Sequence, residues 1–200
     1  MIGYILLTNI VYNMIEINGL DVSHDIRTGN LNNYLIRPMN YFNYRLILYL
    51  SKVIVNSIGY IVPIMAIFCY FHIHILSIMY FIILLLEAII LHYLINYLLS
   101  ICTFWLFNIS SLFYLINIII SFFSGTMLPL DMMPEIIIKC SNYLPFKNLG
   151  YEVSASIFLY RSEYEIWIAI QNGILWIAIL YVIIKILWKA GVKRYEAFSG

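Results

Sequence analysis

The chain has 200 residues, of which 64% are hydrophobic and 10% are charged, and its net charge is +1. Because typical soluble proteins carry about 25% charged residues, this composition excludes a soluble globular domain and indicates a polytopic membrane protein. Residues 53–123 contain one formally charged residue, Glu87, and this stretch is long enough for three crossings of a hydrocarbon core about 30 Å thick.

The membrane-spanning segments are predicted to be helices, so the expected fold is all-α. In lipid, only helices and closed barrels satisfy every backbone polar group, and barrel strands alternate apolar and polar residues. The run Tyr-Phe-Ile-Ile-Leu-Leu-Leu at residues 80–86 shows no such alternation. Neither the three cysteines nor the pair His72 and His74 forms a metal-ligand pattern, and we expect no metal and no cofactor.

The hydropathy pattern indicates a single transmembrane domain over residues 1–200. It predicts five spans, at about residues 2–17, 46–70, 76–104, 112–123 and 166–187. Residues 18–44 form a polar stretch between the first two spans, and residues 124–165 form a mixed segment between the last two. Pro63 is expected to kink the second span, and Gly191 is expected to end the final helix as its C-cap.

Lysine and arginine lie mostly on one side of this topology. That side holds Arg27, Arg37, Arg45, Lys52, Lys185, Lys189, Lys193 and Arg194, and the other side holds Lys139, Lys147 and Arg161. The positive-inside rule therefore predicts that the polar stretch and the C-terminus are cytoplasmic. Five spans then leave Met1 outside without a signal to carry it there. Either the first segment is not a true span or a preceding helix is missing, and we favour the missing helix.

The mixed segment is expected to form a helical hairpin on the outer side. Gly125 and Pro129 interrupt the fourth span, Asp131 is predicted to cap a helix with Pro134 in its first turn, and a second short helix is expected over residues 150–159. These helices are too apolar for a solvated loop and too short to span, which indicates a re-entrant or interfacial hairpin. It is either a lid on a pathway or an amphipathic hairpin resting on the headgroups.

A series of short motifs runs along the chain. They are Asp25-Ile26-Arg27-Thr28-Gly29-Asn30-Leu31 followed by Tyr34-Leu35-Ile36-Arg37-Pro38, then Phe104-Trp105, then Phe123-Ser124-Gly125 with Leu128-Pro129-Leu130 and Pro134, then Leu144-Pro145-Phe146, and the ending from Leu187 to Gly200. In order and spacing this series resembles ABC-2 type transporter permeases, in the branch described as uncharacterised ABC exporter permeases. The likeness covers nearly the whole chain.

The resemblance implies a cell-membrane half-transporter with six spans. Its expected partners are a cytoplasmic ABC ATPase and a second permease, in a homo- or heterodimer. The first span of the family has no counterpart here, which agrees with the problem posed by the charge count. The chain contains no GxxxxGK[ST] loop, so it does not bind ATP by that route. We therefore expect a transport subunit that is not itself an enzyme.

In such a transporter the polar stretch is the candidate segment for coupling to the ATPase. Asn30 can cap a helix over residues 31–36 that Pro38 ends, with Leu31 and Leu35 as an apolar pair at i, i+4. A knob of this kind suits a groove on another subunit. The alternative is a helix on the inner membrane surface. The coupling candidates are Asp25, Arg27, Gly29, Leu31, Leu35, Arg37 and Pro38.

Glu87 is the lone acid at membrane depth, where ionisable residues are costly and commonly functional. It could line the translocation path, accept a hydrogen bond from a Tyr or Asn of a neighbouring helix, or be protonated. The candidates for a pathway or gate are Glu87, Ser124, Gly125, Pro129, Pro134 and Pro145.

Other functions remain as alternatives. A gradient-driven secondary transporter usually shows internal repeats and helices broken near the midplane, whereas the breaks here lie at the outer edge. A non-transporting accessory subunit is a further alternative, and an intramembrane hydrolase lacks the paired groups it needs. An interior rich in Ile, Phe and Tyr is compatible with lipid-like or amphiphilic cargo, although lipid-facing surfaces have the same composition. Membrane lipid is an expected partner and nucleic acid is not.

Overall fold

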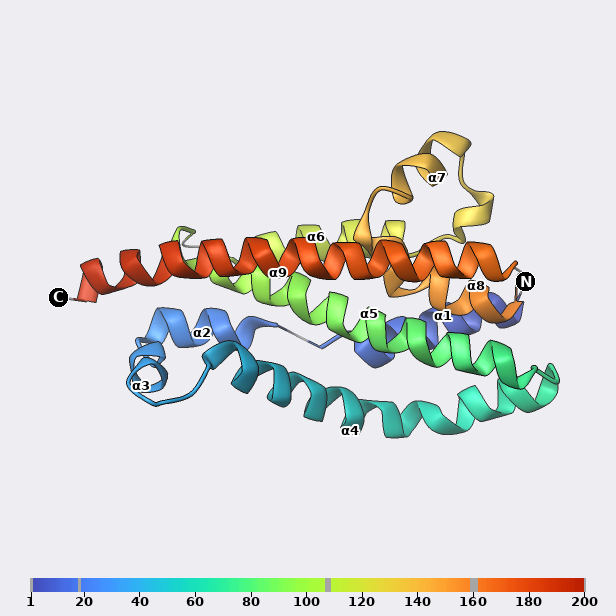
Figure 1. Cartoon of the computed structure of the whole chain (residues 1–200), viewed down its shortest axis with the longest axis horizontal. Helices are drawn as coiled ribbons and strands as arrows, with labels where there is room; N and C mark the ends of the chain where they lie inside the picture. The colour runs from blue at the N-terminus through green and yellow to red at the C-terminus, as the bar shows by residue number, and fades with distance from the viewer. Residues whose placement is uncertain (1, 18, 107–108, 159–161, 200) are drawn as a thin grey trace.

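The computed structural model describes residues 2–17, 19–106, 109–158 and 162–199. The chain is 84% helical and these residues form no strand, which confirms the predicted all-α fold (Figure 1). The helices are α1 Ile2–Ile15, α2 Leu20–Thr28, α3 Leu31–Leu35, α4 Tyr41–Tyr70, α5 Ile75–Ile101, α6 Ser110–Phe123, α7 Glu135–Ser141, α8 Tyr151–Phe158 and α9 Glu163–Ser199. Three short 3-10 turns complete the order, at η1 Cys102–Phe104, η2 Leu130–Met132 and η3 Pro145–Leu149.

Among the described residues, three helices are long and apolar enough to cross a membrane. They correspond to the second, third and fifth predicted spans and cover Tyr41–Tyr70, Ile75–Phe104 and Glu163–Tyr195. Helices α1 and α6 have 14 residues each, fewer than the roughly 20 that a crossing needs, so the division into five spans stays a prediction. Helix α4 begins earlier than expected because the Asn40 side chain accepts a hydrogen bond from the Phe42 amide at 3.0 Å, and it continues through Pro63.

The long helices run side by side, and the two ends of the molecule differ (Figure 1). One end holds α2, α3, the start of α4 and the C-terminal part of α9. The other end holds the N-terminus, the turn between α4 and α5, helix α8 and the start of α9. The polar stretch (residues 18–44) and the C-terminal part of α9, which carries the last lysines, therefore lie at the same end of the bundle. The positive-inside rule predicted that they share one side of the membrane. Which side of the membrane this end faces stays a prediction.

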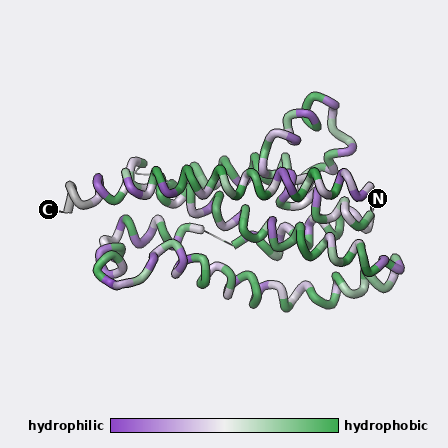
Figure 2. Tube along the Cα trace, viewed as in Figure 1, coloured by the Kyte–Doolittle hydropathy of each residue, from purple (hydrophilic) through white to green (hydrophobic). Residues whose placement is uncertain are grey.

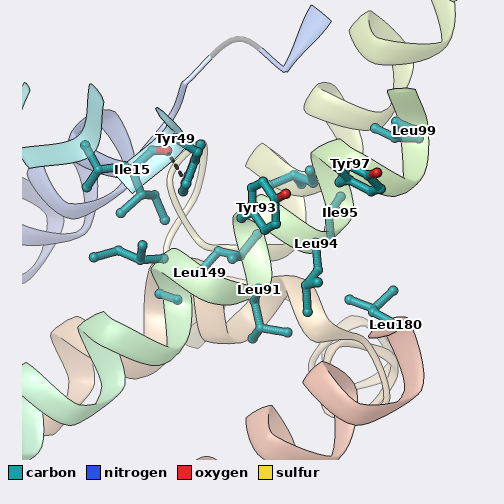
Figure 3. Close-up of a cluster of buried hydrophobic side chains, with 14 of the residues drawn as sticks. Ile15, Tyr49, Leu91, Tyr93, Leu94, Ile95, Tyr97, Leu99, Leu149 and Leu180 are labelled. Atoms are coloured by element: carbon teal, nitrogen blue, oxygen red, sulfur yellow. Dashed lines mark hydrogen bonds between the residues drawn. The ribbon is translucent and has the colours of Figure 1, made fainter. Parts of the chain in front are cut away.

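Helix α5 is the centre of the bundle, and it packs against α1, α2, α8 and α9. It is apolar around most of its circumference, which is the pattern of a helix surrounded by other helices. Figure 3 shows the side chains that meet α5 from other elements, namely Ile15, Tyr49, Leu149 and Leu180. Helix α4 instead exposes large apolar side chains such as Ile54, Ile58 and Val62. Figure 2 shows the hydrophobic character of the long helices beside the more polar α2 and α3.

Three local predictions were wrong. Gly191 does not end α9, because the helix continues to Ser199 and the glycine is needed where α9 meets Phe104, whose ring a Cβ would overlap. Asp131 does not cap α7, whose N-cap is Pro134. The Asp131 carboxylate instead accepts a hydrogen bond from the Tyr151 hydroxyl at 2.6 Å. Asn30 precedes α3 in a helical conformation, and its side chain makes no capping bond.

Candidate functional site

The first candidate site is the junction of α2, α3 and α4, where buried charges fix the coupling segment. The Asp25 carboxylate accepts a hydrogen bond from the Tyr41 hydroxyl at 2.6 Å and pairs with the Arg45 guanidinium. The Asp25 and Arg45 side chains are only 9% and 11% exposed. Arg45 also lies 5.4–5.8 Å from the ring centroids of Tyr34, Tyr41 and Tyr44. Since Tyr34 belongs to α3, this one guanidinium joins three elements.

Helix α2 is also tied to the centre of the bundle. The Ser100 hydroxyl of α5 donates to the Gly19 carbonyl at 2.6 Å, and the Thr103 hydroxyl of η1 donates to the Ser23 hydroxyl at 2.8 Å. These bonds hold a helix whose own sequence is too polar to be recognised by hydropathy. Gly29 then turns the chain into α3 with φ of 78°, a left-handed conformation that glycine adopts without steric cost.

Residues 35–39 form an exposed turn at the tip of this junction. All five side chains are exposed, and Ile36 has 83% of its surface accessible. Leu31 lies in the core with no accessible surface, whereas Leu35 is exposed. The two residues of the predicted apolar pair therefore do not form one exposed stripe. Leu31 can position α3, whereas Leu35 and its neighbours are free to contact another subunit.

The second candidate site is a polar cluster inside the opposite half of the bundle, formed by Glu87, Lys147, Asn148, Glu152 and Gly173. Lys147 and Glu152 form an ion pair at 2.8 Å with side chains 12% and 5% exposed, and Asn148 donates to the Ala169 carbonyl at 3.1 Å. Glu87 is 6% exposed. Neither oxygen of its carboxyl group has a hydrogen-bond partner of normal geometry among the described residues.

Gly173 makes room for the Glu87 carboxyl group. A Cβ at this position of α9 would overlap Oε1 of Glu87 and lie 2.7 Å from Nδ2 of Asn148. The absence of a side chain therefore allows α5, α9 and η3 to approach one another around a carboxyl group. This arrangement combines an acid from α5 with polar groups of the predicted outer hairpin.

The predicted hairpin divides into a buried part and an exposed part. Helix α8 packs against α1 and α5, and its first six residues are all buried. Helix α7 stands away from the long helices (Figure 1), and Ile136 on this helix and Tyr143 just after it are highly exposed. The re-entrant or interfacial character of this hairpin stays a prediction.

A third polar feature, between α1 and α4, was missed in the sequence. Glu16, Ser51, Lys52 and Asn56 contribute to an open groove of about 550 Å³. The Asn56 amide donates to the carbonyls of residues 13 and 14 at 2.9 and 3.0 Å, satisfying groups that the end of α1 leaves unpaired. The signal was present in the spacing of Asn9, Asn13 and Glu16, which places all three on one face of a helix.

Comparison with known proteins identifies the family. A family model described as ABC-2 family transporter protein matches residues 1–199. This chain belongs to the ABC-2 transporter family. No curated protein and no solved structure matches it.

As an ABC-2 family member, the chain is the permease component of an ABC transporter, a membrane-embedded subunit of a kind that works with an ABC ATPase. The structure brings all the coupling candidates of this permease together at one end (Figure 1). The gate candidates fall into two groups in the structure. Glu87 and Pro145 belong to the neighbouring elements α5 and η3, whereas the other candidates lie between α6 and α7. Ser124, Gly125 and Pro129 are buried there, and Pro134 is exposed.

Proposed function

We propose that this permease couples ATP hydrolysis by a separate ATPase subunit to export of a substrate across the cell membrane. The observation that carries the proposal is the exposed turn at residues 35–39, held by the buried Asp25–Arg45 pair. To transmit a movement of the ATPase, a permease needs an exposed contact segment that is firmly attached to its transmembrane helices. The exposed turn provides the contact, and the buried Asp25–Arg45 pair provides the attachment. The proposed location of the junction is the cytoplasm, in keeping with the cationic residues gathered at this end.

The proposed gate is the opposite half of the molecule, where α8 inserts beside α5. A second permease subunit would complete the pathway, as half-transporters require. Opening would separate η3 and α8 from α5 and α9 and give Glu87 access to water or to substrate. The Lys147–Glu152 ion pair stays within the hairpin, so the hairpin can move as a unit.

Affinity purification from the native host tests the proposal. We expect the tagged chain, solubilised in detergent, to bring with it a soluble ATPase and a second permease that mass spectrometry identifies. Ile36→Asp and Arg37→Glu should lose the ATPase and keep the second permease. Asn32→Asp is the matched control, because Asn32 is exposed on α3 but lies outside the exposed turn, and it should behave as the wild type.

The opposite outcome is equally clear. If the wild-type chain is recovered without an ATPase, and its transport stops when the proton gradient is collapsed, the permease is driven by a gradient. Recovery of the ATPase with unchanged yield from both variants would instead leave the exporter in place and remove the coupling role of residues 35–39.

A further inference from the structure

A pocket beside the exposed turn has no role in the function proposed so far. It has a volume of about 350 Å³ and lies between α3, the start of α4, α5 and α9. The residues that matter here are Tyr41, Phe42, Tyr97, Tyr181, Lys185 and Trp188. Small-molecule sites commonly have volumes of 300–1,000 Å³ and combine apolar walls with a few polar groups, and this pocket fits both criteria.

The aromatic walls support one another, so the pocket is formed in advance of any ligand. Tyr41 and Trp188 stack with ring centroids 5.4 Å apart and an interplanar angle of 15°. Phe42 meets Tyr97 edge to face at 5.1 Å and Tyr181 at 5.8 Å. Aromatic pairs in these arrangements attract one another beyond the effect of the area they bury, which helps to hold the walls of the pocket in place.

Lys185 supplies a positive charge to this apolar pocket. Its Nζ lies 4.6 Å from the ring centroid of Tyr181, and no carboxylate of the described residues forms an ion pair with it. Lys185 is exposed at the edge of the pocket, whereas the more buried cations Arg45 and Lys147 are paired with Asp25 and Glu152. The Lys185 charge is therefore available to an anion that enters the pocket.

The surroundings of Lys185 indicate what kind of molecule carries that anion. Val182 and Ile186, close to Lys185 on α9, are 55% and 63% exposed, so the ammonium group emerges from an apolar surface within a membrane-spanning helix. Lysine in such a setting extends its charge toward the headgroups, where it attracts anionic lipid. An amphiphile can reach this position directly from the bilayer.

We propose that the pocket binds an anionic amphiphile, with its negative headgroup at Lys185 and its apolar tail against the aromatic walls. Tyr34, Leu35 and Met39 also line the pocket, so a bound molecule contacts the segment that is proposed to meet the ATPase. Binding itself does not depend on the exporter function; only its consequence for coupling does. The occupant is a membrane lipid or a transported amphiphile of the same chemistry.

Fluorescence of Trp188 measures occupancy. Trp105, Trp167 and Trp176 are replaced by Phe so that Trp188 is the single emitter, and the full chain is placed in nanodiscs. Phosphatidylglycerol or phosphatidylcholine with brominated tails is added at equal mole fraction. We expect the anionic lipid to quench Trp188 several times more strongly than the zwitterionic lipid.

Variants of the two neighbouring lysines provide the controls. Lys185→Gln should remove the preference, and Lys185→Arg should keep it. Lys189→Gln, one helical turn further along, should also keep it, because Lys189 is exposed but does not line the pocket. Equal quenching by the two lipids in the wild type, or the same preference in Lys185→Gln, would overturn the proposal.

A single-chain alkyl phosphate without bromine distinguishes the two sources of ligand. If it restores the fluorescence quenched by phosphatidylglycerol, the pocket accepts free amphiphiles as a cargo site would. If it does not, while the Lys185-dependent preference stands, the occupant is a bilayer lipid. Both results are consistent with the proposed binding site. Neither depends on whether an ATPase co-purifies, so a failure of the binding proposal can be told apart from a failure of the exporter proposal.

Discussion

Two buried carboxyl groups of this bundle, those of Asp25 and Glu87, lie in different surroundings. The carboxylate of Asp25 is paired with Arg45, so its burial is compensated by an ion pair and a hydrogen bond. Glu87 lacks a hydrogen-bond partner of normal geometry among the described residues and is accommodated by the missing side chain of Gly173. A buried polar group without a hydrogen-bond partner is costly, which is one reason why we propose Glu87 as part of the gate.

Gly173→Ala tests the close approach around Glu87. The new methyl group must push α9 away from the carboxyl group, and overpacking of this kind typically costs about 1–3 kcal/mol. We expect a lower midpoint of thermal unfolding for the detergent-solubilised protein, followed by size-exclusion fluorescence. The additional change Glu87→Ala should restore part of the loss, because it removes the overlapping atoms.

Gly59→Ala is the matched control for that experiment. Gly59 lies inside the apolar helix α4, and a Cβ there would meet no atom within 4 Å. Replacing it should leave the stability unchanged or raise it by up to about 1 kcal/mol through helix propensity. Equal destabilisation by both substitutions would contradict a specific role for the space beside Glu87.

At the scale of elements, hydropathy located the long helices and missed what depends on tertiary contacts. Helices α4, α5 and α9 were predictable because their apolar runs exceed the thickness of a bilayer. Helix α2 was read only as part of a polar stretch, because its stability comes from bonds to residues such as Arg45 and Thr103 that lie far along the chain. The existence of α8 was predicted from its residues, but no periodicity indicated that it would pack beside Glu87.

The groove between α1 and α4 gives a prediction about water. Single cysteines at Glu16 and Ser51, which line the groove, should react with a membrane-impermeant thiol reagent in a chain with Cys69, Cys102 and Cys140 replaced by Ala. Polar side chains on an exposed face lower the cost of hydrating the groove. The thiolate, which is the form of cysteine that attacks the reagent, forms where water reaches the side chain.

Cysteines at Ile54 and Ile58 are the controls, because these residues are exposed on the apolar face of α4. They should remain unlabelled under the same conditions. Similar labelling at all four positions, measured by mass shift on a gel, would contradict a hydrated groove confined to the polar face.

At the scale of the whole molecule, the two ends define a direction. The cationic residues of the polar stretch and of α9 gather at the end that carries the exposed turn (Figure 1). The positive-inside rule predicts that this end faces the cytoplasm. We expect a cysteine at Ile36 to be labelled only after the cells are permeabilised, and a cysteine at Met127 to be labelled in intact cells.

Both positions are highly exposed, so a difference in labelling reports the side of the membrane and not burial. The reverse pattern would invert the orientation and place the exposed turn outside, where no cytoplasmic ATPase reaches it. Labelling is read in the cysteine-free background used for the groove.

Helix α9 extends through both halves of the molecule as one continuous helix. Its 37 residues extend for about 55 Å at 1.5 Å per residue, well beyond a hydrocarbon core about 30 Å thick. If α9 pivots at the close contact around Gly173, Trp188 lies about 22 Å from the pivot along the helix axis. A tilt of about 10° at the pivot would swing Trp188 through about 4 Å, so a small opening around Glu87 would be magnified at the aromatic pocket and the exposed turn.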